Sequence, residues 1–273
     1  MNTIGLNIIL KMGCICSKQT LIINSKKYYI REHLGEGGFS TVDLIEDAMT
    51  GKYYAVKKII CHGIDDMKVA MKEIEYHEAL KHPNIIRCID SAKYGQPDPV
   101  LNSTSEVLLV LPYYQRGTLA HELALRSSTN NHMLPIDILH MFIRICEGVR
   151  AFHEATPEPL AHRDLKTANI LLSNDNMPII MDLGSVAVAR VKICGSSEAQ
   201  QLQDMASERC SMPYRAPELF NVESYCMIDE RTDIWDMHDL ILYMLKVNPM
   251  ERPYIYSVIE KTHDVISKLE ARA

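Results

Sequence analysis

The sequence lacks a long apolar segment, a paired arrangement of cysteines and a surplus of charge of one sign. No run approaches the roughly 20 apolar residues that a membrane-spanning helix needs, and none of the eight cysteines forms a CxxC pair that would hold a structural metal. Basic and acidic residues number 29 and 35, are dispersed along the chain and leave a formal charge of −6. We therefore expect no membrane span, no structural metal and no nucleic-acid partner.

The sequence also lacks internal repeats, low-complexity tracts and a convincing secretory signal. The first apolar stretch has neither a basic flank nor a cleavage site. A reducing compartment with free thiols is therefore expected.

Two lobes of different character follow from the apolar pattern of the 273 residues. Residues 28–114 hold short β-type runs, separated by glycine-bearing turns, and one helical stripe that ends at a proline. Residues 115–273 are mostly helical, and Pro135 opens a helix that is apolar nearly all round. The pattern predicts an α+β fold, with a small antiparallel β-rich lobe and a mainly helical lobe after an N-terminal extension, residues 1–27.

Two glycines, Gly35 and Gly37, lie where one predicted strand turns into the next. Residues without a β-carbon let backbone N–H groups approach phosphate oxygens closely. Lys57 follows on the third predicted strand, where its ammonium can pair with α- and β-phosphates. Each feature alone also fits a plainer interpretation, a hairpin turn and a solvated lysine.

The segment HRDLKTAN, residues 162–169, is a sharper signal because three chemical groups share one loop. Asp164 can accept the proton of an attacking hydroxyl, Lys166 can neutralise charge on a transferring phosphoryl group, and Asn169 can hold Mg²⁺. A surface loop rarely carries this string by chance. The segment therefore predicts phosphoryl transfer.

A second carboxylate, Asp182, comes eighteen positions after Asp164 at the end of an apolar run. There it can chelate Mg²⁺ that bridges nucleotide phosphates, although a strand-ending turn is the alternative. Further on, Glu218 in YRAPE and Arg252 in ERP are predicted to form a structural carboxylate–guanidinium pair.

These motifs occur in one order, each on the type of element that it needs, and together they resemble a eukaryotic protein kinase. The resemblance covers residues 35–218, with DLG in place of the usual DFG. It implies ATP and Mg²⁺ as cofactors and proteins as substrates. It also implies that Asp164 and Lys166 are catalytic and that Asn169 and Asp182 are metal ligands.

By the same resemblance, the helix glutamate that positions Lys57 is Glu73, with Glu75 as the alternative. Leu111 would be the gatekeeper beside the adenine, while the carbonyl of Pro112 and the N–H of Tyr114 would bond to it. The ATP-binding residues implied in this way are Leu34, Gly35, Gly37, Val42, Ala55, Lys57, Glu73, Leu111, Pro112 and Tyr114.

Lys166 and Ser211 are similar to the corresponding residues of serine/threonine kinases, which implies that protein hydroxyls are phosphorylated. Arg163 resembles the arginine of kinases whose activation segment is ordered by phosphorylation, since it can pair with a phosphate. Candidate acceptors in that segment are Ser185, Ser196, Ser197 and Ser207, although a serine in a long polar loop is more often unmodified.

Residues 202–235 resemble the Numb-associated kinase family, and within it a small branch that is acylated near its N-terminus and associates with Golgi membranes. The string MGCICSK, residues 12–18, is similar to the start of that branch. It implies myristate on Gly13 and palmitate on Cys14 and Cys16, because one myristoyl chain binds membranes only marginally.

Myristoylation requires an N-terminal glycine, so this anchor depends on translation from Met12. The chain would then lie on the cytoplasmic face of Golgi or perinuclear membranes, and would be cytosolic without acylation. The alternative is a strand-leading turn with two ordinary thiols.

The chain departs from the kinase pattern in its second lobe, where only 34 positions separate Glu218 from Arg252. The family has several tens more, so the lobe is predicted to be internally truncated near residue 237. A catalytically weak or silent kinase-fold scaffold is the alternative function that this shortening favours. A small-molecule kinase is disfavoured by Lys166 and YRAPE, which belong to protein-substrate recognition in the family.

Overall fold

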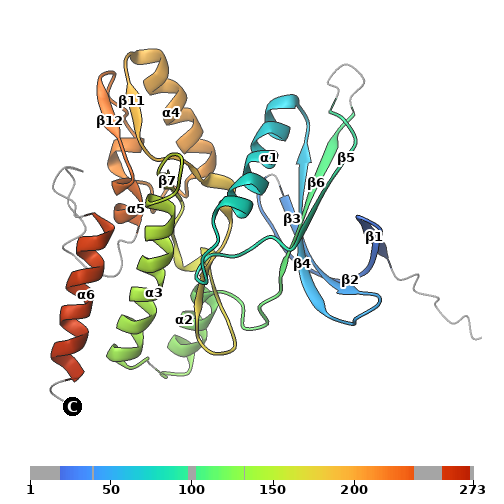
Figure 1. The fold of residues 1–273 in the computed structure, drawn as a ribbon, viewed down its shortest axis with the longest axis horizontal. Coiled ribbons are helices and arrows are strands. Elements are labelled where there is room, and N and C mark those ends of the chain that lie inside the picture. The colour runs from blue at the N-terminus through green and yellow to red at the C-terminus, as the bar shows by residue number, and fades with distance from the viewer. Residues whose placement is uncertain (1–18, 39, 98–102, 132, 237–253, 271–273) are drawn as a thin grey trace, which may run out of the picture.

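The computed structural model describes residues 19–38, 40–97, 103–131, 133–236 and 254–270. These residues form a β-rich lobe and a mainly helical lobe, which confirms the predicted α+β, two-lobed fold (Figure 1). The acylation motif at residues 12–18, the predicted truncation point at 237 and Arg252 lie outside the described residues.

The first lobe is a six-stranded antiparallel sheet with one helix, α1 (Ile64–Ala79). The sheet order is β1 (Thr20–Ile23), β2 (Lys26–Glu36), β3 (Ser40–Asp47), β4 (Tyr53–Cys61), β6 (Ser105–Pro112) and β5 (Asp90–Tyr94). Strand β1 belongs to the stretch that was predicted to be an extension, so the sheet begins before residue 28.

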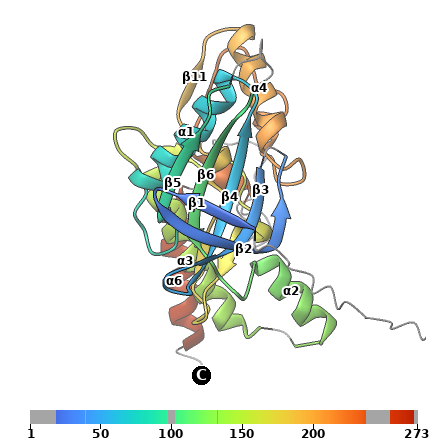
Figure 2. The same ribbon diagram turned by 90° about the vertical axis from the view of Figure 1, so that its right-hand side faces the viewer.

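The two faces of this sheet are buried differently, as the alternating side chains of β6 show. Val107 and Leu109 pack toward α1, with Ile59, Ala70 and Ile74. The neighbours of Val107 and Leu109 on β6 point to the opposite face, where a second cluster is closed by β1 and β2: Ile23, Tyr28, Ile45, Val56, Leu108 and Val110. Strands β1 and β2 therefore form the outer wall of this lobe (Figure 2).

The second lobe is centred on α3 (Pro135–His153), which has Pro135 in its first turn as predicted. Its other helices are α2 (Leu119–Ser128), α4 (Ser196–Arg209), α5 (Arg231–Asp236) and α6 (Ile255–Glu270). Helix α6 lies beside α3 (Figure 1), and Val258 and Ile259 enter the core that α3 dominates. None of the helices in the described ranges is long and apolar enough to cross a membrane.

Short elements connect these helices, and Asp164, Lys166 and Asp182 lie in the loops between them. The short elements are β7 (Leu160–Ala161), η1 (Thr167–Asn169), β8 (Ile170–Leu172), β9 (Pro178–Ile180), η2 (Leu183–Ser185), β10 (Ala187–Val188), β11 (Val191–Ile193), η3 (Pro217–Leu219) and β12 (Cys226–Ile228). Strands β11 and β12 pair and share a small core with α4 and η3. The segment that was interpreted as a long polar loop is therefore partly helical.

Candidate active site

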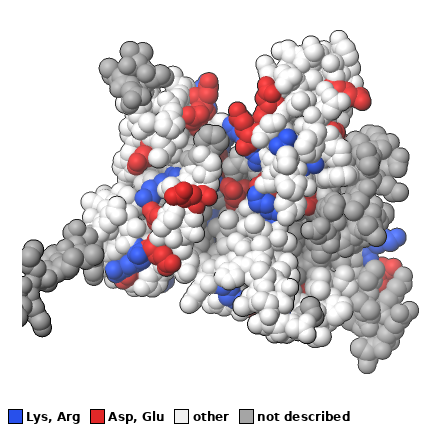
Figure 3. All heavy atoms as spheres, turned by 180° about the vertical axis from the view of Figure 1, so that it is seen from behind, with Lys and Arg blue, Asp and Glu red and all other residues white. Residues whose placement is uncertain are grey.

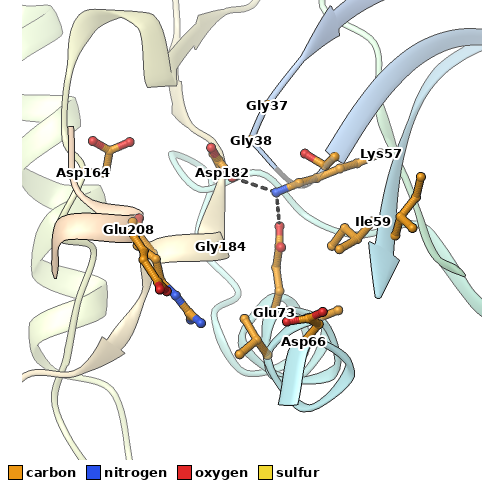
Figure 4. A pocket seen from close by; sticks show the side chains of 16 residues that line it. Gly37, Gly38, Lys57, Ile59, Asp66, Glu73, Asp164, Asp182, Gly184 and Glu208 are labelled. Carbon is orange, nitrogen blue, oxygen red and sulfur yellow. Dashed lines mark hydrogen bonds and ion pairs between the residues drawn. The ribbon is translucent and has the colours of Figure 1, made fainter. Parts of the chain in front are cut away.

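Lys57 on β4 pairs with one carboxylate of its own lobe and with one of the second lobe. Its Nζ donates to Glu73 Oε1 on α1 and to Asp182 Oδ1 in front of η2, both at 2.7 Å (Figure 4). Of the two glutamates considered for this position, Glu73 is buried and Glu75 is exposed. The structure thus pairs Lys57 with Glu73 and adds Asp182 to the same cation.

Burial and neighbouring charges shift the pKa values of these three groups in opposite directions. Burial would lower the pKa of Lys57, but the charges of Glu73 and Asp182 outweigh it and raise that pKa. Burial raises the pKa of Glu73, while Lys57 opposes the rise. The Lys57 ammonium lowers the pKa of Asp182 to about 2. Asp182, whose side chain is 42% exposed, is therefore an anion facing solvent at neutral pH.

Asp164 accepts hydrogen bonds from three residues that the sequence places on two different segments. Lys166 Nζ donates to its Oδ2 at 2.8 Å and Asn169 Nδ2 at 2.9 Å, while the Ser211 N–H donates to its Oδ1 at 2.9 Å. Lys166 Nζ also donates to Ser211 Oγ at 2.5 Å. These hydrogen bonds connect residues 162–169, called the catalytic loop below, to the segment after α4 through the Asp164 carboxylate.

Asp233 on α5 accepts hydrogen bonds from the backbone of the catalytic loop. Its carboxylate accepts from the N–H groups of His162 at 2.8 Å and Arg163 at 2.7 Å, and it lies 3.0 Å from His153 Nε2. Arg163 has φ of +64°, a conformation that is unfavourable for a bulky residue. The two bonds from Asp233 explain how the loop keeps this conformation next to Asp164.

Asp236, one turn further along α5, is also buried and accepts from the Leu165 N–H at 3.2 Å. Burial and the neighbouring charge of Asp233 raise the pKa of Asp236 well above its ordinary value. Neither aspartate stands in a motif that was predicted to carry function. The signal that could have found them is a pair of acidic residues at helical spacing in an otherwise apolar stretch, DIWD.

A cavity of about 240 Å³ between the lobes is lined by the predicted catalytic groups. Lys57, Glu73, Asp164 and Asp182 line it, together with the glycine-rich turn, as Figure 4 shows. Glu208 and Arg209 at the end of α4 also line it and were not expected there. Figure 3 shows acidic and basic side chains interspersed on both sides of the hollow between the lobes.

The residues expected around the adenine lie on adjacent strands. Gly35 pairs with Val42, Val42 with Lys57, and Ala55 with Leu111. Three further members of that set have these positions: Leu34 is exposed on β2, Pro112 ends β6, and Tyr114 follows it. The turn between β2 and β3 is closed by the Gly37 N–H, which donates to the Ser40 carbonyl at 2.7 Å.

The remaining predicted residues are divided between described and undescribed parts of the chain. The Tyr114 side chain lines a second cavity, with His77 and Arg87, rather than the catalytic one. Glu218 lies in η3, while its expected partner falls outside the described residues. Ser185 Oγ donates to the His162 carbonyl at 2.9 Å, and three candidate acceptors lie on α4: Ser196, Ser197 and Ser207.

The arrangement is matched by known proteins over most of the chain. The protein kinase domain family matches residues 28–254. The chain belongs to the protein kinase family. It is 42% identical over 241 residues to serine/threonine-protein kinase 16 of Homo sapiens, which covers 88% of this chain and 75% of the relative. The Rattus norvegicus protein of the same name is 42% identical with the same coverage.

More distant relatives carry the same activity in their names. Serine/threonine-protein kinase ENV7 of Saccharomyces cerevisiae is 27% identical over 296 residues, which covers 88% of this chain and 80% of the relative. The chain is thus an ATP- and Mg²⁺-dependent protein kinase, as the family uses both.

The donor set in the cavity fits a nucleotide-bound Mg²⁺, which prefers oxygen ligands. The Asp182 carboxylate faces solvent at the cavity. Asn169 uses its Nδ2 to bond the Asp164 carbonyl and carboxylate, both at 2.9 Å, so its Oδ1 is the atom left to face a cation. The two segments are neighbours, since the Met181 N–H donates to the Asn169 carbonyl at 2.9 Å, so Asn169 and Asp182 offer two oxygen ligands from adjacent segments.

Proposed function

We propose that this kinase transfers the γ-phosphate of ATP to serine or threonine hydroxyls of proteins while attached to a membrane surface. The observation that supports the transfer step is that Lys57, Asp164 and Asp182 face one cavity from three separate segments. Such convergence is what phosphoryl transfer requires, because positioning and charge stabilisation supply most of its catalysis.

Each residue then has a separate task in the reaction. Lys57, held by Glu73, binds the α- and β-phosphates. Asn169 and Asp182 would hold the Mg²⁺, which would supply positive charge to neutralise the phosphates. Asp164 accepts the proton of the attacking hydroxyl, which must enter within about 3 Å of its carboxylate. Lys166 lies beside that carboxylate and stabilises negative charge on the phosphoryl group.

Replacing Asp164 with Asn tests this assignment. The variant keeps the size of the side chain but cannot take a proton, so kcat should fall by about 10²–10⁴-fold in a phosphotransfer assay with ATP and Mg²⁺. The matched control is Asp175→Asn in the exposed turn between β8 and β9, which should keep full activity. Equal phosphate incorporation by both variants would overturn the assignment.

The membrane part of the proposal rests on the N-terminal string and on the similarity to the Numb-associated branch. Translation from Met12 exposes Gly13 for myristate, and Cys14 and Cys16 supply thiols for palmitate. A durable anchor needs two such signals. The Golgi membrane is the proposed location because that branch associates with it.

Intact-mass analysis of protein made in a eukaryotic cell tests the anchor. The expected product begins at Gly13 and carries one myristoyl group with up to two palmitoyl groups. A Gly13→Ala variant should carry no myristate and should fractionate with cytosol. An unacylated wild-type product that begins at Met1 would remove the anchor from the proposal and leave the kinase activity untouched.

A catalytically weak scaffold is the second candidate, and the shortened second lobe favours it. A relative from Dictyostelium discoideum aligns over 299 residues, which exceeds the 273 residues of this chain, so that protein has segments that this chain lacks. Nucleotide binding, seen as a thermal shift with ATP and Mg²⁺, together with no turnover of general kinase substrates would favour the scaffold.

A further inference from the structure

The outer surface of the β1–β2 hairpin carries a combination of side chains that is unusual for a solvent-facing sheet. Ile22 stands directly across from Lys27, and Thr20 from Tyr29, so these four residues share one face. Ile22 is 61% exposed although it is a large apolar residue. Arg31 lies on the same face, because its guanidinium stands over the Tyr29 ring. We call Ile22, Lys27, Tyr29 and Arg31 the hairpin face.

The hairpin is fixed rigidly in the outermost layer of the first lobe. Asn24 at its turn donates to Asp90 Oδ1 at 2.7 Å and to the Ser91 carbonyl at 2.8 Å, and Tyr94 donates through its hydroxyl to the Ile22 carbonyl at 2.8 Å. The inward side chain of Ile23 is fully buried. Figure 2 shows β1 and β2 crossing in front of the other strands, so the hairpin face points away from the sheet.

The chemistry of the hairpin face suits the boundary between water and lipid. Lys27 Nζ lies 5.6 Å, and the Arg31 guanidinium 5.3 Å, from the Tyr29 ring centroid. Tyrosine is favoured at membrane interfaces, and long cationic side chains extend their charges toward headgroups while their methylenes cover apolar surface. Arg31 forms an ion pair with Glu46, whereas Lys27 has no carboxylate partner among the described residues. A free cation beside an exposed isoleucine thus complements an anionic surface.

The acylation sites set how far this face can be from a bilayer. Thr20 comes four positions after Cys16, and an extended chain spans at most about 3.6 Å per residue. A palmitoylated Cys16 therefore keeps β1 within about 14 Å of the headgroups, close to the distance of about 8–10 Å over which surface charge acts at physiological salt. The tether therefore keeps the hairpin, of all the sheet, nearest in sequence to the bilayer.

We propose that the hairpin face docks on an anionic lipid bilayer and fixes the orientation of the acylated kinase. This inference rests on the anchor in the proposed function and adds the protein surface that meets the lipid. Figure 1 places β1 at the end of the first lobe that is farthest from the second lobe. In the docked state the catalytic cavity is therefore turned away from the bilayer and is open to substrates from the cytoplasm.

Vesicle co-sedimentation of the protein translated from Met12 and myristoylated by co-expression tests the surface. The face variant Ile22→Ser/Lys27→Glu is compared with Leu125→Ser/Lys192→Glu, in which an exposed aliphatic residue on α2 and an exposed lysine on β11 are replaced by Ser and Glu. On vesicles containing phosphatidylserine, the face variant should partition about tenfold less, since each basic residue near such a surface contributes about 1 kcal/mol. The control pair should bind like wild type.

The outcomes separate the two proposals. If the myristoylated wild type binds vesicles no better than Gly13→Ala, which cannot carry the myristoyl chain, the anchor fails and the hairpin inference falls with it. If wild type binds and both double variants bind equally, the hairpin inference alone is overturned. Phosphotransfer to a soluble peptide should be the same in all three proteins, which shows that each is folded.

Acetylation of lysines by a water-soluble ester gives a direct readout of orientation. With phosphatidylserine vesicles present, Lys27 should be modified several-fold more slowly than without them, whereas Lys192 should be unaffected. Equal modification of Lys27 with and without vesicles, in protein that has bound them, would overturn the docking surface.

Discussion

At the residue scale, the site depends on a cation that is expensive to bury alone. Lys57 and Glu73 have side chains that are only 12% and 5% exposed, and the charge of each opposes the effect of burial on the pKa of the other. Breaking a buried pair by removing one partner costs about 3–5 kcal/mol, because it leaves an uncompensated charge. The same pair thus serves stability and nucleotide binding, and variants can separate these contributions.

Lys57→Met should abolish phosphotransfer and lower the free energy of unfolding by about 3–5 kcal/mol at neutral pH. Without the ammonium, burial raises the pKa of Glu73 further above its unfolded value, so the folded state loses stability as pH rises through that pKa. The deficit should therefore be larger at pH 7.5 than at pH 5 in urea titrations.

The double variant Lys57→Met/Glu73→Gln is the control for this argument. It removes both charges and should recover most of the stability but none of the activity. A double variant as unstable as Lys57→Met at pH 7.5 would show that the unpaired carboxylate is not the cause.

Ser211 is a positioning residue, because its hydroxyl accepts from Lys166 and its N–H donates to Asp164. Ser211→Ala should lower kcat by about tenfold with little change in the KM for ATP, since losing a hydrogen bond to a charged group costs about 1.5–3 kcal/mol. Ser211→Thr keeps the hydroxyl and should restore most of the rate in steady-state assays. Equal rates for the alanine and threonine variants would contradict this role.

At the scale of elements, α5 places two buried aspartates under the catalytic loop with opposite consequences. Asp233 accepts from two backbone N–H groups and lies next to His153, and these partners keep its pKa low despite complete burial. Asp236 has one such donor and a raised pKa. One residue is thus stabilised as an anion, while the other resists ionisation.

The same Asp→Asn substitution should therefore act in opposite directions at these two sites. Asp233→Asn brings an amide against N–H donors and should destabilise the fold by about 1–3 kcal/mol and suppress activity. Asp236→Asn should raise the melting temperature at pH 7.5. A raised native pKa means that stability is present at low pH and is lost as pH rises through it, so the gain should shrink toward pH 5.

Thermal melts of both variants at the two pH values provide the measurement. A fall in melting temperature for Asp236→Asn at pH 7.5 would contradict the raised pKa.

Local patterns predicted the elements whose periodicity is regular, and missed those set by distant contacts. The stripe that predicted α1 contains Ala70 and Ile74, which are buried as expected, and Pro135 marked the start of α3 correctly. Strand β1 is only four residues long and gains its stability from β2 and β5, so no local signal distinguished it from an extension. Helix α4 is mostly polar because only one narrow side is buried.

In the candidate site too, residues in local motifs were predicted, whereas residues placed by distant contacts were not. Lys57, Asp164 and Asp182 stand in motifs whose chemistry is local, and the structure brings them to one cavity. Arg209 reaches that cavity only because α4 packs on η3 and the β11–β12 pair, a contact that its own neighbours in sequence do not encode.

At the scale of the whole molecule, the second lobe is predicted to be internally shortened near residue 237, and its core would then form with fewer residues than the family has. Ile255, Val258 and Ile259 of α6 enter the same core as Phe142 and Phe152 of α3. A fully buried side chain of this kind contributes about 1.5–3 kcal/mol. A domain has a free energy of unfolding of only about 5–15 kcal/mol. The loss of several such contacts elsewhere in the lobe would therefore remove a large part of it.

The purified chain should therefore melt at a lower temperature than serine/threonine-protein kinase 16 of Homo sapiens, and less cooperatively. Calorimetry of both proteins in the same buffer with and without ATP and Mg²⁺ makes the comparison. A cooperative transition at the temperature of the human protein would refute the view that the shortened lobe weakens the fold.

If α6 closes the core of a marginally stable lobe, replacing one of its buried side chains with a smaller one should destabilise the protein strongly. Ile259→Ala removes a side chain that is 7% exposed and should cost about 2–5 kcal/mol. Glu260→Ala, at the exposed neighbouring position of the same helix, should change stability by less than about 0.5 kcal/mol. Urea titrations should show Ile259→Ala partly unfolded without denaturant, with phosphotransfer reduced in proportion to the folded fraction. Full activity and an unchanged midpoint for Ile259→Ala would mean that α3 is stabilised without α6, and that the second lobe has more stability in reserve than its length indicates.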